Sequence, residues 1–141
     1  MSNTVDLDLV SKTWERAWNQ LNPSLLAPFL AENHVPHQSL NPVSGREGVM
    51  QFILAFQEAF PDLAFVVEDM IVAGEKIVLR WSMSGTQSGE LMGIPPTRRR
   101  VRLTGISIYR FEDGRAVESW DELDMLNLLF QLGLLDKSEY N

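Results

Sequence analysis

The sequence predicts an α+β domain in which three N-terminal helices pack on one face of a strongly bent antiparallel sheet and enclose a pocket with it. Three observations lead to this fold class. Apolar residues recur at steps of three and four up to Phe60, which is the period of helices. After Pro61 they alternate with the period of strands, and glycine-containing turns separate the alternating segments. Helices followed by hairpin-connected strands are typical of an α+β fold.

Composition limits the functions that the chain can have. With 141 residues, of which 45% are hydrophobic and 22% charged, we expect one folded domain over residues 1–141. A formal net charge of −7 disfavours nucleic acid and anionic membrane surfaces as partners. The absence of cysteine excludes thiolate catalysis and thiolate metal sites.

The sequence also carries no pattern that directs a chain to a membrane. No stretch approaches the ~20 apolar residues that span a bilayer. Residues 1–8 lack the basic and apolar pattern of a signal peptide. We therefore expect a cytoplasmic protein with no membrane partner.

The first part of the chain predicts two helices and an irregular segment. The apolar stripe of the first helix consists of Val10, Trp14, Ala17, Trp18 and Leu21. Pro23 suits the first turn of a short second helix, which ends at Leu30, because its missing N–H would be unpaired there in any case. Residues 31–42 are polar and irregular and predict a loop or a short edge strand that contains His34 and His37.

A capping box predicts the start of the third helix. In Ser44-Gly45-Arg46-Glu47, the Ser44 hydroxyl and the Glu47 carboxylate would reciprocally satisfy free backbone N–H groups. The apolar stripe of this helix consists of Val49, Phe52, Ile53, Phe56 and Phe60. We expect the stripe to pack in the core and Pro61 to end the helix.

Segments rich in β-branched and aromatic residues predict four strands, at residues 63–73, 76–86, 99–111 and 116–124. Gly74-Glu75 and Asp113-Gly114 are hairpin turns, in which glycine supplies the positive φ that tight turns require. The apolar segment 125–135 predicts a short helix that closes the pocket or packs against a second subunit.

An ordered set of short motifs covers most of the chain. The set runs Phe60-Pro61-Asp62, Arg80-Trp81, Gly85-Thr86, Gly89-Glu90, Gly93-Ile94-Pro95-Pro96-Thr97, Arg110, Asp113-Gly114-Arg115, Glu118, Trp120, Asp124 and Gln131-Leu132-Gly133. With these motifs the chain resembles the SnoaL-like polyketide cyclase, or ester cyclase, family from Ser11 to Leu135. The resemblance implies the cone-shaped barrel of ketosteroid isomerase, scytalone dehydratase and nuclear-transport-factor-like proteins, usually as a homodimer. It also implies a carboxylate that acts as general acid/base in an intramolecular aldol ring closure, without metal or organic cofactor.

The last predicted strand carries the candidate acid/base residues. Alternation places Glu118, Trp120, Glu122 and Asp124 on one face, and Val117, Ser119, Asp121 and Leu123 on the other. Because Trp120 is bulky and apolar, we expect its face to turn inward and to bring Asp124 to the pocket rim. A carboxyl group that faces an apolar cavity loses hydration, which favours its protonated form and lets it exchange a proton with a bound molecule. The competing interpretation of Asp124 is a solvated charge or an ion pair with Arg80 or Arg110. Asp121 is the second candidate, which a β-bulge would turn inward.

His37 is the third candidate catalytic residue. It lies where the family often has a pocket histidine within a His-Asp-Pro pattern, although Gln38 and Ser39 follow it here. A neutral imidazole could orient substrate or pair with the aspartate. A histidine in a surface loop is the alternative for His37, and it is the expectation for His34.

Gln87 marks a departure from the family. Where the family commonly has Gly-Thr-His, this chain has Gly85-Thr86-Gln87. Glutamine can donate and accept hydrogen bonds but cannot change its charge near neutral pH. Binding could therefore survive in this chain where catalysis does not.

Large apolar side chains are expected to form the pocket wall. By alternation Trp81 and Met83 share the strand face of Gln87, and the further wall residues are Trp14, Trp18, Phe56 and Trp120. For Trp14 and Phe56 the alternative is packing in the core without ligand contact. Aromatic surfaces suit a small apolar or polycyclic organic ligand. No metal is expected, because two histidines three residues apart with no nearby carboxylate do not make a ligand set.

Three functions follow as hypotheses. The first is a cofactor-independent cyclase or isomerase that acts on a carbonyl-containing, polyketide-like substrate with Asp124 as acid/base. The second, favoured by Gln87, is a non-catalytic protein that binds an apolar metabolite. The third is a hydrolase of the same fold, in which a carboxylate activates water.

Overall fold

The computed structural model describes residues 6–37 and 44–140. Its elements, in chain order, are α1 (Leu7–Asn19), the 3-10 helix η1 (Pro23–Phe29), β1 (Leu30–His37), α2 (Gly45–Ala59), β2 (Ala64–Ala73), β3 (Lys76–Thr86), β4 (Arg100–Glu112), β5 (Arg115–Leu123), α3 (Met125–Gln131) and the 3-10 helix η2 (Lys137–Tyr140). The α+β class predicted from the sequence is confirmed.

The sheet is mixed and open, which corrects the expectation of a purely antiparallel sheet. The five strands follow the order β1-β5-β4-β3-β2. Neighbouring pairs are antiparallel except β1 and β5, which run parallel. Residues 30–37 therefore form the edge strand that was one of two expectations for this region. Because β1 and β2 lie at opposite edges, the sheet does not close into a barrel.

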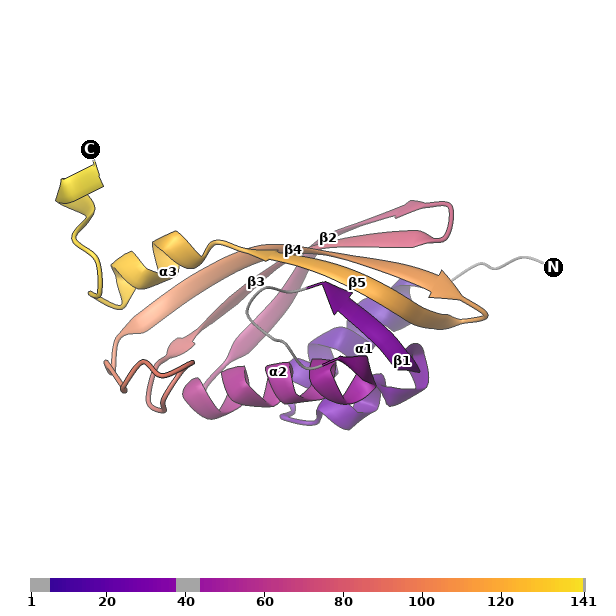
Figure 1. The fold of residues 1–141 in the computed structure, drawn as a ribbon, viewed down its shortest axis with the longest axis horizontal. Helices are drawn as coiled ribbons and strands as arrows, with labels where there is room; N and C mark the ends of the chain where they lie inside the picture. The colour runs from indigo at the N-terminus through magenta and orange to yellow at the C-terminus, as the bar shows by residue number, and fades with distance from the viewer. Residues whose placement is uncertain (1–5, 38–43, 141) are drawn as a thin grey trace.

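Two helices cover one face of the curved sheet (Figure 1). The Asn19 side chain fixes the end of α1 to β2 by two hydrogen bonds with the Phe65 backbone, of 2.9 and 2.6 Å. The Gln57 amide of α2 donates to the carbonyl oxygens of Ala17 and Trp18, both at 3.0 Å. The two helices and β2 are thereby locked together, and the core lies between them and the sheet.

The capping box predicted at Ser44 does not form. Ser44 precedes α2, but its hydroxyl makes no capping hydrogen bond. Gly45 follows with a φ of 83°, a left-handed conformation that the capping-box geometry does not include. Helix α1, by contrast, does have a side-chain cap. The Asp6 carboxylate accepts from the Leu9 N–H at 3.1 Å, which is the usual N-cap hydrogen bond.

Helix α3 continues from the end of β5 and lies beyond the edge of the helical layer (Figure 1). The Gln131 side chain accepts from the Arg102 N–H at 2.7 Å and donates to the Arg102 carbonyl at 2.8 Å, which ties α3 to β4. No helix within residues 6–37 and 44–140 is both long and apolar enough to cross a membrane.

Candidate active site

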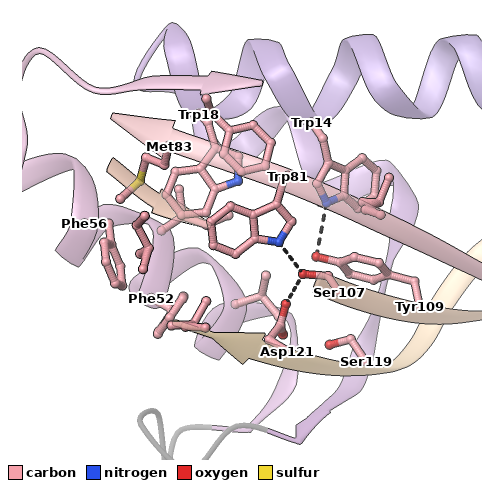
Figure 2. A pocket seen from close by; sticks show the side chains of 16 residues that line it. Trp14, Trp18, Phe52, Phe56, Trp81, Met83, Ser107, Tyr109, Ser119 and Asp121 are labelled. Atoms are coloured by element: carbon pink, nitrogen blue, oxygen red, sulfur yellow. Dashed lines mark hydrogen bonds between the residues drawn. The ribbon is translucent and has the colours of Figure 1, made fainter. Parts of the chain in front are cut away.

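A small apolar cavity lies between the inner face of the sheet and helices α1 and α2 (Figure 2). Its lining consists of Trp14, Trp18, Val49, Phe52, Ile53, Phe56, Phe65, Leu79, Trp81, Met83, Leu103, Ser107, Tyr109, Ser119, Asp121 and Leu123. The volume of about 40 Å³ holds only a few water molecules. A bicyclic organic molecule is larger than this volume, so the lining has to rearrange when one binds.

Asp121 ends a directed chain of hydrogen bonds inside this cavity (Figure 2). The Trp81 indole N–H donates to the Ser107 hydroxyl at 2.9 Å, and that hydroxyl donates to Asp121 Oδ1 through a short hydrogen bond. An indole nitrogen can only donate, so the single Ser107 hydrogen is committed to the carboxylate. The chain fixes the orientation of Asp121 against an aromatic wall.

Strand pairing explains why these residues meet. Ser107 on β4 lies opposite Asp121 on β5, and Trp81 on β3 lies opposite Gly105 on β4. A Cβ atom at Gly105 would lie 2.2 Å from Cζ2 of Trp81, so the indole rests directly on the glycine backbone. Only glycine leaves room for the indole to reach Ser107.

Tyr109 contributes a phenolic hydroxyl to the same cavity. Trp14 Nε1–H donates to the Tyr109 oxygen at 3.1 Å, and the two rings pack edge to face. Burial raises the pKa of Tyr109 well above its ordinary value, and the nearby negative charge of Asp121 adds to the effect. The phenol is therefore neutral at physiological pH.

His34 and Ser119 form a second polar pair. His34 is fully buried, with Nδ1 2.8 Å from the Ala116 carbonyl oxygen and Nε2 2.8 Å from Ser119 Oγ. Because a carbonyl only accepts, Nδ1 must carry the hydrogen. Burial lowers the pKa of His34 below 6.5, so the ring is neutral at pH 7 and Nε2 accepts from the Ser119 hydroxyl. The expectation of a surface-loop histidine is wrong for His34.

The predicted facing of β5 is also wrong. Ser119, Asp121 and Leu123 line the cavity, whereas Trp120 lies on the opposite face. There its ring stacks on His37 at 5.1 Å between centroids, and the Lys76 ammonium lies 5.3 Å from its centre. His37 and Lys76, on the same outer face of the sheet, cover part of the Trp120 ring. This large side chain therefore does not have to be buried in the core.

His37 belongs to this outer cluster and not to the cavity. Its Nε2 lies 2.9 Å from Glu118 Oε2, and 43% of its side chain is exposed. The hydrogen bond from Arg110 Nε, at 2.6 Å, is the main cause that lowers the pKa of Glu118. We name Lys76, Arg110, His37, Glu118 and Trp120 the outer cluster.

Asp124 lies beyond the end of β5 and does not line the cavity. It is the N-cap of α3, and its carboxylate accepts from the Asn127 N–H at 3.2 Å. Its own N–H donates to the Thr104 carbonyl at 3.1 Å. Neither Arg80 nor Arg110 pairs with it among the described ion pairs.

Gln87 organises the loop after β3 and is not a lining residue. Its buried amide nitrogen donates to the carbonyl oxygens of Gly89, Ile94 and Pro95 at 3.1–3.2 Å. Its oxygen accepts from the Thr97 N–H at 3.2 Å and from the Thr97 hydroxyl at 2.7 Å. Both ends of the Gln87 amide are thus hydrogen-bonded within the loop.

Five of the predicted wall residues do line the cavity: Trp14, Trp18, Phe56, Trp81 and Met83. Sequence reasoning missed Ser107, Tyr109 and Ser119. The signal was present, because Ser107 and Tyr109 alternate with outward residues in the same period-two pattern as Leu103.

The described part of the chain contains no group of three or more histidine, aspartate or glutamate side chains placed to hold a metal ion. The polar groups that line the cavity are instead a carboxylate, hydroxyl groups and an indole N–H. These groups can exchange protons and orient oxygen atoms of an organic molecule.

The family model of the SnoaL-like polyketide cyclases matches residues 8–132. The chain therefore belongs to the SnoaL-like polyketide cyclase family, as the motifs of the sequence indicated. No curated protein matches the sequence.

Several solved structures share the fold and at least 30% of the aligned residues. TsrD from Streptomyces laurentii is 32% identical with a TM-score of 0.85, over 94% of this chain and 100% of TsrD. AclR from Streptomyces galilaeus, proposed to be a hydroxylase, is 30% identical with a TM-score of 0.78, over 92% of this chain and 84% of AclR. IdmH from Streptomyces antibioticus, proposed to be a polyketide cyclase, is 30% identical with a TM-score of 0.75, over 89% of this chain and 96% of IdmH.

Proposed function

We propose that this protein is a cofactor-independent cyclase or isomerase in which Asp121 is the general acid/base for an apolar, carbonyl-containing substrate of polyketide type. One observation carries the proposal: Asp121 is the only charged residue among the described residues that line the cavity. A carboxylate held against aromatic side chains loses hydration, which favours proton exchange with a bound molecule.

The chemistry would proceed in two proton transfers. The Asp121 carboxylate takes a proton from the carbon next to a substrate carbonyl, and the C–H electrons move to the carbonyl oxygen as an enolate. In a cyclase the enolate carbon then attacks a second carbonyl of the same molecule, which forms the C–C bond. The protonated Asp121 returns its proton to the new alkoxide. In an isomerase it returns the proton to another carbon.

The Trp81 and Ser107 contacts support this role. The Ser107 hydroxyl donates to one carboxylate oxygen and the Trp81 N–H holds that hydroxyl, so Asp121 is oriented before substrate arrives. Preorganised groups of this kind lower a barrier because they need not reorient during the reaction. The similarity to IdmH, a proposed polyketide cyclase, supports the polyketide class of substrate.

The test is deuterium exchange at the carbon next to the carbonyl of 2-tetralone, a bicyclic ketone, in D₂O. The wild type should accelerate exchange at C1, and Asp121→Asn should reduce the acceleration by about 10²–10⁴-fold, the range for a lost general base. Asp124→Asn tests the sequence-based alternative, since asparagine is also a good N-cap and should keep α3 intact. Thermal unfolding of each variant is measured separately.

Two outcomes decide between the hypotheses. Full exchange activity in Asp121→Asn together with loss in Asp124→Asn would return the role to Asp124. Binding of ketones by the wild type with no exchange would favour the second hypothesis, a non-catalytic protein that binds an apolar metabolite.

We also propose that the protein forms a homodimer, as the resemblance to the SnoaL-like family implies. Val66 and Ile106, on the strands of the sheet, are 43% and 47% exposed, which offers an apolar surface for a second copy. Sedimentation at the monomer mass across micromolar concentrations would contradict this proposal.

A further inference from the structure

We propose that Tyr109 is a second catalytic residue, which donates its phenolic hydrogen to the carbonyl oxygen of the ligand that occupies the cavity. The inference deepens the proposed function, on which it rests, because it names the group that the ligand must carry. It follows from the hydrogen bond that the Tyr109 hydroxyl accepts and from the absence of one that it donates to the described residues.

The first step is the direction of the Trp14 contact. An indole N–H can only donate, so the Tyr109 oxygen accepts in the 3.1 Å hydrogen bond with Trp14 Nε1. The phenolic hydrogen therefore has to point elsewhere. Among residues 6–37 and 44–140, the described hydrogen bonds of Tyr109 include none that its O–H donates.

The second step is the cost of that arrangement. Tyr109 is only 8% exposed and lines the cavity, and its hydroxyl hydrogen costs about 1–3 kcal/mol when neither a ligand nor a water molecule in the cavity accepts it. Phenylalanine would fill the same space without this cost. A hydrogen-bond donor at this place is explained when the acceptor arrives with a ligand.

The third step is the position of Tyr109 relative to Asp121. In the β4–β5 register Tyr109 lies opposite Ser119, and Ser107 lies opposite Asp121, so Tyr109 and Asp121 are diagonal neighbours on one face. The backbones of diagonal neighbours lie about 7–8 Å apart, a spacing that aromatic and long side chains can bridge. A carbonyl group bound between the two side chains can therefore face the Tyr109 hydroxyl while its α-carbon faces Asp121. In Figure 2 the Tyr109, Ser107 and Asp121 side chains gather at one side of the cavity, away from Phe56 and Met83.

The fourth step is the chemistry of the pair. When Asp121 removes the proton, the C–H electrons move to the carbonyl oxygen, which becomes negative. The Tyr109 O–H stabilises that oxygen by a hydrogen bond and keeps its own proton, because burial raises the pKa of Tyr109 above the physiological range. Loss of one such donor typically reduces a rate by 10²–10³-fold.

The experiment compares 2-tetralone with tetralin, which has the same bicyclic frame without the carbonyl. Binding to the wild type and to Tyr109→Phe is measured by tryptophan fluorescence and calorimetry. The wild type should bind the ketone about tenfold more tightly, the factor expected for one hydrogen bond, and Tyr109→Phe should bind both compounds equally. Exchange at C1 of 2-tetralone should fall by about 10²-fold in the variant.

A matched control and a second readout separate this role from a structural one. Tyr140→Phe removes the hydroxyl of the only other tyrosine of the chain and should keep the tenfold preference. Infrared difference spectra of the bound ketone should show the C=O stretch moved to lower frequency in the wild type and not in Tyr109→Phe. The frequency shift in the wild type can be measured without any variant, so this readout does not depend on whether Tyr109→Phe folds.

The outcomes are distinct from those of the proposed function. Asp121→Asn should lose exchange but keep the preference for the ketone, so failure of Asp121 as the base leaves Tyr109 as a donor testable. No preference in the wild type, no binding of either compound, or an unchanged preference in Tyr109→Phe would each overturn the proposal.

Discussion

The two faces of β5 carry similar side chains in different surroundings. On the inner face, Asp121 accepts from a hydroxyl that is itself held by an indole, beside an aromatic wall. On the outer face, Glu118 pairs with Arg110 and lies next to His37, and all three side chains are partly exposed. A carboxylate that a cation pairs keeps its charge, whereas contact with an apolar wall favours the protonated form of a carboxyl group. The difference lies in the surroundings and not in the residue type.

The largest effect on this comparison is expected from Ser107→Ala. The variant leaves Asp121 in the cavity but removes the hydroxyl that orients it and the acceptor of the Trp81 N–H. We expect deuterium exchange of 2-tetralone to fall by about 10- to 100-fold, the scale of a misplaced reacting group. Glu118→Gln, on the outer face, is the matched control and should change the rate by less than about twofold. Equal losses in the two variants would remove the distinction between the faces.

The next effect concerns the packing that brings Trp81 to Ser107. In Gly105→Ala the new methyl group would meet the Trp81 ring at 2.2 Å, so the indole has to move. Overpacking of this kind should destabilise the protein by about 2 kcal/mol, measured by urea unfolding. Ile106→Ala, whose side chain is 47% exposed on the neighbouring outer position, should cost clearly less. A Gly105→Ala protein with wild-type stability and activity would show that the close approach of Trp81 is not required.

A smaller effect is expected from pH. Burial lowers the pKa of His34 below its ordinary value of 6.5. At pH values between the lowered pKa of the folded protein and the ordinary pKa of the unfolded chain, the unfolded chain binds more protons than the folded one. The stability contributed by the neutral ring is fully present above about pH 6.5 and declines as the pH falls below it. Urea unfolding of the wild type and His34→Gln between pH 7.5 and 5 checks this, with a shallower decline expected in the variant. An equally steep decline in His34→Gln would contradict this role of the buried ring.

The smallest effect is expected from His37→Ala. The variant breaks a contact with Glu118 at a position that is 43% exposed and removes the ring that stacks on Trp120. Exchange activity should stay within about twofold, and the midpoint of thermal unfolding within about 3 °C. A tenfold loss of activity would instead connect the outer cluster to the chemistry and restore His37 as a catalytic candidate.

Much of the fold could be predicted from the sequence, because local patterns determine it. Alternation predicts strands at 76–86 and 116–124, and the structure has Lys76–Thr86 and Arg115–Leu123. The parallel edge strand could not be predicted in the same way. Residues 30–37 contain polar side chains and a proline, and their strand exists only because β5, far along the chain, offers them a partner.

The site could be predicted only in part, for a related reason. Alternation correctly sorts β5 into two sets, but it does not say which set faces inward, and the bulk of Trp120 favoured the wrong one. That choice depends on His37 and Lys76, which come from β1 and β3 and cover Trp120 from outside. The burial of His34 likewise depends on Ala116 and Ser119. Such long-range contacts leave no local signal.

The β1–β5 pairing has a consequence for the order in which the molecule forms. The hydrogen bonds of His34 close loops of 82 and 85 residues, whereas the β2–β3 and β4–β5 hairpins close across tight turns. Long loops lose more chain entropy on closure and form more slowly than hairpins. We therefore expect the hairpin strands to assemble early in refolding and the Ser119 corner of the cavity to be completed last.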